Sequence, residues 1–131
     1  MEAVDFAEEI RFSRRSPNSI DYWQRAVATG DGSMLHSESG IWRATAAGPL
    51  EVTVALPGAT EVSEGSVDGA TIRVASTAIG LAATGTKLRQ AIRRYDLTGD
   101  SLTYEISIAT ADFALTAHIS GELHRSENRS G

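Results

Sequence analysis

The side chains best suited to binding a transition metal are three histidines, His36, His118 and His124, because the chain contains no cysteine. His118 and His124 lie six residues apart on one expected strand. At about 3.3 Å per residue they are separated by roughly 20 Å, so they cannot bind one ion together. A single histidine can still serve as the axial ligand of a haem iron. The residues alone indicate a structural role for His36 and a solvated position for His124.

The segment around His118 alternates along its length, and two interpretations of it are open. One face carries Phe113, Leu115, Ala117, Ile119, Gly121 and Leu123, and the other carries Thr116, His118, Ser120 and Glu122. Alternation favours His118 in solvent and the apolar face in the core. In the second interpretation, His118 points into a cavity, where the small Thr116 and Ser120 leave room beside its ring.

Other groups of polar residues give weaker indications of chemistry. His36, Glu38 and Gly40 share one strand face, which is typical of a cross-strand polar ladder. Glu61 and Glu64 resemble paired carboxylates, although nothing in the sequence sets the distance between them. One basic cluster is expected either to be a solvated face or to meet carboxylates or propionates at the mouth of a pocket. It consists of Lys87, Arg89, Arg93 and Arg94.

The pattern along the chain predicts an all-β fold. Runs of five to ten alternating residues, such as 50–56, 71–75 and 102–108, are separated by turn signals rich in Gly, Pro, Asn and Asp. Asp68-Gly69 predicts a hairpin with a primed turn. Residues 2–12 are expected to form a strand, whereas the segment Thr86–Arg94 is expected to be a short helix or a loop over one end of the sheet.

Length and charge limit the function classes. The 131 residues suit one domain, which we expect over residues 1–125, followed by a polar tail at 126–131. The net charge of −5 argues against nucleic acid as a partner. No apolar stretch is long enough to span a membrane and no signal peptide is visible, so a soluble, cytoplasmic protein is expected.

Several segments, taken together and in order, resemble the nitrobindin family. Residues 6–12 are similar to its aromatic-x-Glu-Glu strand, and residues 35–43 to its Leu-His-x-Glu-x-Gly segment. The resemblance continues through 51–65, with Gly58, Glu61, Glu64 and Gly65, and through 94–104 with Tyr95 and Tyr104. It ends at 115–125, where His118 matches the histidine that binds the haem iron in the family.

This resemblance implies an antiparallel up-and-down β-barrel of the calycin, fatty-acid-binding-protein-like kind. It implies one haem b per chain with His118 as the axial ligand of the iron, and thereby replaces the outward orientation given by alternation. The pocket wall is expected to include Ile79, Leu81, Tyr95 and Leu115. The implied activity is binding of nitric oxide or isomerisation of peroxynitrite to nitrate, with chemistry supplied by the iron and no catalytic side chain assigned.

The chain departs from the family at its start, where the Gly-x-Trp-x-Gly-x-Gly strand and a Tyr-Pro-Thr segment are missing. The barrel is therefore expected to lack the first of ten strands, which leaves an unpaired edge. Three explanations are open: the chain is shortened, a partner such as a second copy in a homodimer pairs with the edge, or the protein keeps the barrel without normal haem binding. Two other functions are open: a haem-free carrier of a fatty acid or other apolar ligand, and a module that docks a partner along the edge strand.

Overall fold

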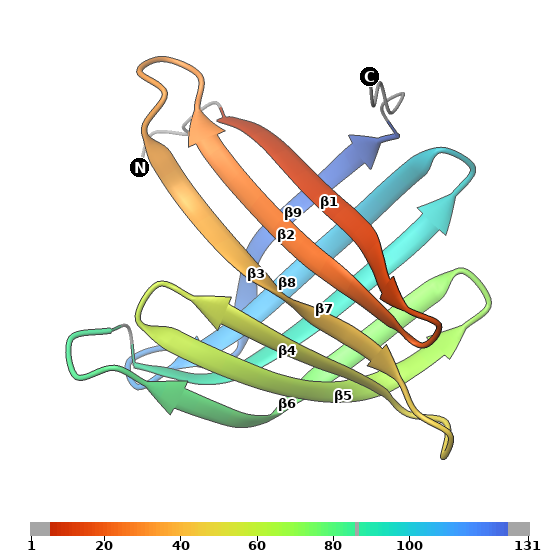
Figure 1. The fold of residues 1–131 in the computed structure, drawn as a ribbon. Helices are drawn as coiled ribbons and strands as arrows, with labels where there is room; N and C mark the ends of the chain where they lie inside the picture. Colours follow the sequence, from red (N-terminus) through yellow and green to blue (C-terminus); the bar gives the residue numbers. More distant parts are fainter. Residues whose placement is uncertain (1–5, 86, 126–131) are drawn as a thin grey trace.

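The computed structural model describes residues 6–85 and 87–125, which form nine β-strands in one antiparallel sheet. The strands are β1 (Phe6–Ser16), β2 (Ser19–Ala28), β3 (Met34–Ala44), β4 (Leu50–Leu56), β5 (Ala59–Asp68), β6 (Thr71–Leu81), β7 (Leu88–Thr98), β8 (Ser101–Thr110) and β9 (Thr116–His124). Their order in the sheet is their order along the chain (Figure 1). The sheet curls into a nearly closed barrel, which confirms the predicted fold class. In the described ranges no helix is long and apolar enough to cross a bilayer.

Tight turns join most neighbouring strands, as the turn signals predict. Asp68 pairs with Thr71, so Gly69 and Ala70 form a two-residue hairpin turn between β5 and β6. Gly69 has φ of 61°, and no residue other than glycine has positive φ in the described chain. Only the first central residue of this turn is therefore left-handed, which fits the primed turn that needs glycine at that position alone.

The expectation of a helix or loop at Thr86–Arg94 is wrong. Thr86 lies outside the described residues, and Leu88 begins the strand β7. The pairing of β7 with β8 skips Arg89, because Leu88 pairs with Thr110 and Gln90 pairs with Ala109. This bulge interrupts the alternation at the start of the strand and conceals the period of two that would have identified it.

The core lies on the inner face of the barrel and is rich in aromatic rings. The buried cluster consists of Tyr22, Trp42, Val52, Val54, Val74, Tyr95, Tyr104 and Ile106. The rings of Trp42 and Tyr95 meet edge-on with centroids 4.9 Å apart, and Tyr95 stacks on Tyr104 at 6.3 Å. Such contacts add to the burial of apolar area, so the aromatic rings join the β1–β3 side of the sheet to the β7–β9 side.

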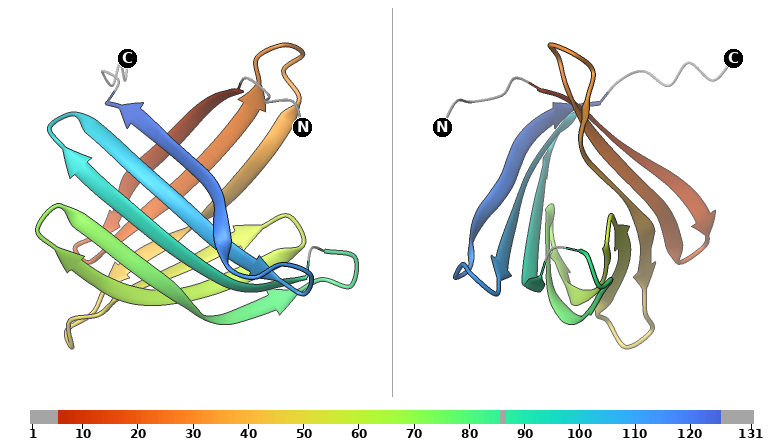
Figure 2. Two further views of the ribbon diagram at one scale, coloured as in Figure 1. Left: turned by 180° about the vertical axis from the view of Figure 1, so that it is seen from behind. Right: turned by 90° about the vertical axis from the view of Figure 1, so that its left-hand side faces the viewer.

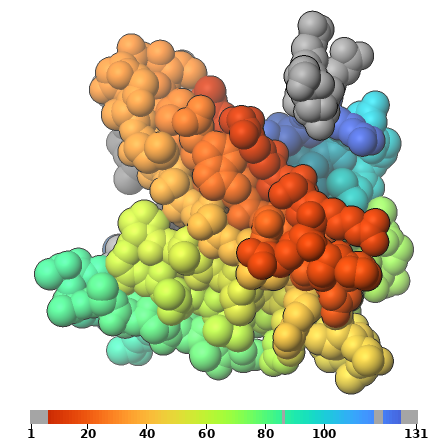
Figure 3. All heavy atoms as spheres, viewed as in Figure 1, coloured from red at the N-terminus to blue at the C-terminus, as the bar shows by residue number. Residues whose placement is uncertain are grey.

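The two ends of the sheet, β1 and β9, do not pair with each other. They approach at one end, where a Cβ on Gly121 of β9 would lie 2.6 Å from a carboxylate oxygen of Glu8 of β1. Toward the end of β1 and the start of β9 they diverge, as Figure 2 shows in its right-hand view. The face of β1 that is turned toward the viewer in Figure 3 is not covered by another strand.

The ladder between β6 and β7 is the shortest in the described sheet, with five residue pairs from Thr71–Asp96 to Ala75–Ile92. Beyond Ala75 the two strands separate, although the Ala91 amide still donates a hydrogen bond of 2.9 Å to the Ser76 hydroxyl. The far ends of β6 and β7, at Leu81 and Leu88, are thus joined by the loop between these two strands rather than by further ladder pairs.

Gly40 allows a close approach that no larger residue permits. A Cβ there would lie 1.9 Å from the Thr53 carbonyl oxygen of β4. We expect Gly40→Ala to lower the free energy of unfolding by about 2 kcal/mol, a cost typical of overpacking, as measured by urea denaturation. Gly30→Ala is the control, because its Cβ would meet nothing within 4 Å. Equal stability of the two variants would contradict this packing argument.

Candidate functional site

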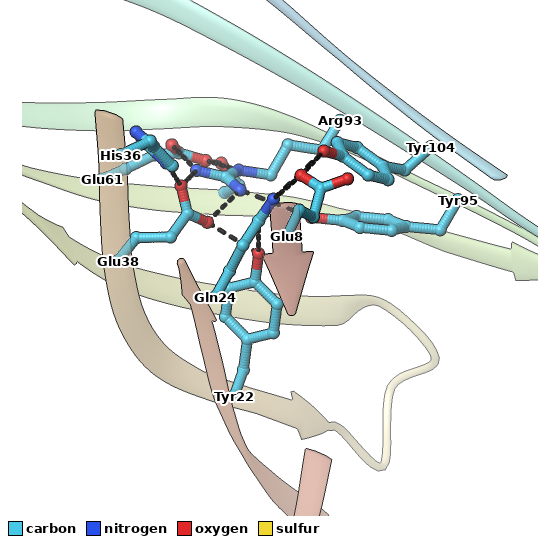
Figure 4. A network of polar contacts seen from close by, with 10 residues as sticks. Glu8, Tyr22, Gln24, His36, Glu38, Glu61, Arg93, Tyr95 and Tyr104 are labelled. Carbon is cyan, nitrogen blue, oxygen red and sulfur yellow. Dashed lines mark hydrogen bonds and ion pairs between the residues drawn. The ribbon is translucent and has the colours of Figure 1, made fainter. Parts of the chain in front are cut away.

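A buried arginine, Arg93 of β7, is the centre of a polar network inside the barrel (Figure 4). Its guanidinium forms two parallel bonds to Glu61 of β5, from Nε to Oε2 at 2.9 Å and from Nη2 to Oε1 at 2.8 Å. Nη1 also donates to Glu38 of β3 at 2.5 Å. All three side chains are 1% exposed or less. Charges buried in this way are stable only when paired, so Arg93 holds β3, β5 and β7 in one arrangement.

The network continues across the barrel toward β1. The Tyr22 hydroxyl lies 2.8 Å from the Glu38 carboxylate and also contacts the amide oxygen of Gln24. The Gln24 amide donates to the Tyr104 hydroxyl and to Glu8, each at 3.3 Å. The Tyr104 hydroxyl donates to the Glu8 carboxylate. Glu8 thus joins the edge strand β1 to β8, next to Gly121 of β9.

Protonation states in the network follow from its pairing. Burial alone raises the pKa of the Glu38 carboxyl, but the hydrogen bond from His36 and the charge of Arg93 outweigh it and lower the pKa to about 2. Burial, which disfavours the phenolate, raises the pKa of Tyr22 and of Tyr104. At neutral pH, Glu38 is therefore an acceptor, and the two phenols remain protonated donors.

The structure separates two groups that the sequence brings together. Glu61 is 1% exposed on the inner face, whereas Glu64 is exposed, so they are not a carboxylate pair. The proposed basic cluster also divides, because Arg93 is buried in the network while Arg94 is exposed and paired with Asp96 at 2.9 Å. The reason is the same in both cases: residues one or three positions apart on a strand face opposite sides of the sheet. Lys87 and Arg89 remain exposed.

Sequence reasoning missed the buried network because it treated charged strand residues as solvated. One signal was available: Arg93 stands between Ala91 and Tyr95 in a series with period two, so it shares the buried face of β7. His36, expected to be structural, lies with its Nε2 2.6 Å from Glu38. The predicted ladder of His36, Glu38 and Gly40 is thus on one face, and that face is the interior.

The backbone of His118 lies in β9, but its side chain lies outside the described part of the structure, as do those of Ala117 and Ile119. His124 is on the same strand with 73% of its side chain exposed, and its Nδ1 is 3.1 Å from the Ser101 hydroxyl. The solvated position expected for His124 is confirmed.

Of the expected pocket-wall residues, Leu81 and Leu115 are more than 40% exposed and Ile79 is half-buried. Tyr95 is 1% exposed and packed between Trp42 and Tyr104. The end of β6, which Leu81 completes, and the loop between β8 and β9, which contains Leu115, lie at the same end of the barrel (Figure 2, left).

The residues around the start of β9 fit a haem group. Phe113 is 70% exposed and Leu115 42%, which leaves large apolar side chains uncovered shortly before His118. Across the gap, Phe12 of β1 packs on Trp42 and yet is 43% exposed. Among the described residues, the indole N–H of Trp42 is the buried side-chain donor without a partner. A porphyrin needs apolar walls and cations near its propionates, and the Ala111 amide bonded to the Lys87 carbonyl at 3.1 Å brings Lys87 to this loop.

Comparison with known proteins gives one consistent result. The family described as "THAP4-like, heme-binding beta-barrel domain" matches residues 1–125. Peroxynitrite isomerase 2 of Mycobacterium avium is 34% identical over 130 residues, which cover 95% of this chain and 81% of that protein. Peroxynitrite isomerase 1 of Mycobacterium tuberculosis is 33% identical over 129 residues, with 92% and 79% covered. The crystal structure of Rv2717c from M. tuberculosis superposes with a TM-score of 0.85 at 31% identity, covering 97% of this chain and 84% of that one.

The lowered pKa of Glu38 predicts how stability depends on pH. A carboxyl that titrates near pH 2 when folded, against 4.5 normally, contributes its full stability above pH 4.5 and loses it as the pH falls toward 2. We expect the difference in unfolding free energy between the parent and Glu38→Gln to be largest at neutral pH and to shrink below pH 4.5. Glu64→Gln, which removes a carboxylate from the exposed face of the barrel, is the control for the loss of one negative charge. A difference independent of pH would show that Glu38 is not ionised in the fold.

Replacement of Arg93 tests whether the barrel needs the several hydrogen bonds that a planar guanidinium donates. Lysine keeps the charge but cannot donate two parallel bonds to Glu61 while also reaching Glu38. We expect Arg93→Lys to lower the free energy of unfolding by about 3 kcal/mol, close to the cost of breaking a buried ion pair. Arg94→Lys, exposed on the same strand, should change it by less than about 1 kcal/mol. Similar values for both variants in urea denaturation would refute the central role of Arg93.

Proposed function

The chain belongs to the nitrobindin family of THAP4-like, heme-binding β-barrels, and we propose that it binds one ferric haem b through His118 and converts peroxynitrite to nitrate. The observation that carries the proposal is the family match over residues 1–125, with His118 placed on β9 just after the exposed Phe113 and Leu115. The proposal includes nitric oxide as a second small ligand of the iron and the cytoplasm as the site of action.

In this proposal the protein's own residues bind and orient the haem. The His118 imidazole supplies the axial ligand, and a hydrogen bond to its other nitrogen would fix the tautomer. Leu81, Leu115 and Phe113 supply apolar walls, because they are uncovered at the end of the barrel where β9 begins. Lys87 and Arg89 are the exposed cations of this region for the propionates. When bound, the iron supplies a coordination position where peroxynitrite can rearrange.

The buried network around Arg93 has a different task in this proposal. Its acceptors and donors are directed at one another inside the barrel, with Glu38 and Glu61 committed to Arg93. Charged groups that are paired with one another and shielded from water keep their positions. We assign them to holding the barrel open on its β1–β9 side, so that the haem site has rigid walls. This arrangement does not favour a carrier of apolar ligands, since buried polar side chains such as Gln24, Glu38 and Arg93 interrupt the apolar inner face.

Haemin titration tests the proposal. We expect the parent chain to show a saturable one-to-one Soret shift and His118→Ala to lose it, because the iron loses its protein ligand. His124→Ala is the matched control, since this exposed histidine lies on the same strand and should leave the titration unchanged. The haem-loaded parent should then accelerate peroxynitrite decay with nitrate as product.

Two results would contradict the proposal. Weak, unsaturable haemin binding by the parent would leave the haem-free carrier as the better interpretation. An unchanged Soret band in His118→Ala would show that another residue binds the iron.

A further inference from the structure

The strand β9 contains one residue too many at the position of His118. Ile106 of β8 pairs with Ile119, and the next residue, Ser107, pairs with Ala117. Residue 118 therefore has no partner in the ladder and is the inserted residue of a β-bulge. Bulges bend a strand and redirect a side chain, and they are frequent next to active sites.

The bulge changes which positions of β9 face the interior. After it, Gly121 pairs with the buried Tyr104, and Leu123 packs against the core. Unbroken alternation would continue this inner series through residues 119, 117 and 115. The register instead places Thr116 opposite Ile108, which packs against the core, and Ala117 opposite Ser107. Position 118 belongs to neither series.

The same sheet shows what happens to a residue inserted in this way. Four other register shifts interrupt the ladders, and in each case the inserted residue can be identified from the pairing. These residues are Arg15, Leu35, Thr77 and Arg89, and all four are exposed. Even the apolar Leu35 is 47% exposed. Insertion at a bulge in this barrel thus keeps a residue out of core packing.

An axial ligand needs that freedom, because a side chain committed to core packing cannot approach an iron atom. We infer that the β9 bulge is the element that presents His118 to the haem: it frees position 118 from the alternation of the strand. Ala117 is then a positioning residue, since its presence in the chain creates the bulge. This inference rests on the proposed function and adds the backbone register as the determinant of its ligand.

Two single-residue deletions in β9 distinguish the effect of strand register on haemin binding from the effect of strand length. Deletion of Ala117 leaves Thr116, His118 and Ile119 consecutive, so His118 pairs with Ser107 in a regular ladder. Deletion of Thr116 shortens the same strand equally but keeps Ala117 opposite Ser107 and His118 in the bulge. We expect the first deletion to weaken haemin binding at least about tenfold, as loss of ligand orientation does, and the second to leave the affinity and Soret band close to those of the parent.

A double substitution tests the same inference without shortening the chain, so its result does not require that a deletion variant folds. In Ala117→His/His118→Ala the imidazole moves by one position, into the ladder opposite Ser107. We expect this variant to keep the far-ultraviolet spectrum and urea midpoint of the parent and to lose the saturable Soret shift. Its control is Ala117→Ser, which keeps His118 in the bulge and should bind haemin like the parent.

The outcomes distinguish this inference from the proposed function. If the parent binds haemin and His118→Ala does not, while deletion of Ala117 or the double variant binds as tightly as the parent, the proposed function stands and the bulge has no positioning role. Equal losses in the two deletions would also overturn the inference, because strand length would then explain both. If the parent itself does not bind haemin, both are wrong.

Discussion

The ion pairs of Arg93 with Glu61 and Glu38 are the interaction on which the interior of this barrel depends. They connect β7 to β5 and β3 without the intervention of β6, and they do so where water is excluded. Each buried charge has a desolvation cost of several kcal/mol that only a well-formed partner offsets. The three strands must therefore reach their native positions together. The aromatic contacts around Trp42 and the hydrogen bonds that extend to Glu8 are built on that arrangement.

Much of the fold was predictable, because it follows from local chemistry. Glycine in a left-handed conformation at residue 69, and proline followed by asparagine at 17–18, mark turns wherever they occur. Alternation identifies strands such as β4 and β8, whose inner and outer faces differ clearly. The strand β7 was missed for an equally physical reason. Its bulge at Arg89 and its buried Arg93 break both the period and the polarity that a strand with one buried face normally shows.

The candidate site was predictable only in part. The residues indicated that one histidine could bind a haem iron, but alternation and family resemblance disagreed on His118. The backbone register adds that position 118 lies between the two inner series of β9 without a ladder partner, and the role of His118 stays a prediction. No sequence pattern predicts the bulge at position 118, because a bulge depends on how the partner strand pairs. The partners of Glu38 were equally out of reach, since Arg93 is 55 positions further along the chain.

The short ladder between β6 and β7 has a consequence for how the chain acquires its structure. With five residue pairs, it is the narrowest backbone connection between the first six strands and the last three. Backbone pairing there is too limited to hold the two parts firmly, so side chains from β3, β5 and β7 must complete the union. Docking of the last three strands is then all-or-none, because an incompletely docked Arg93 would lack the carboxylates that compensate its charge. Hairpins on either side can form early and locally, whereas the whole barrel forms as one cooperative unit.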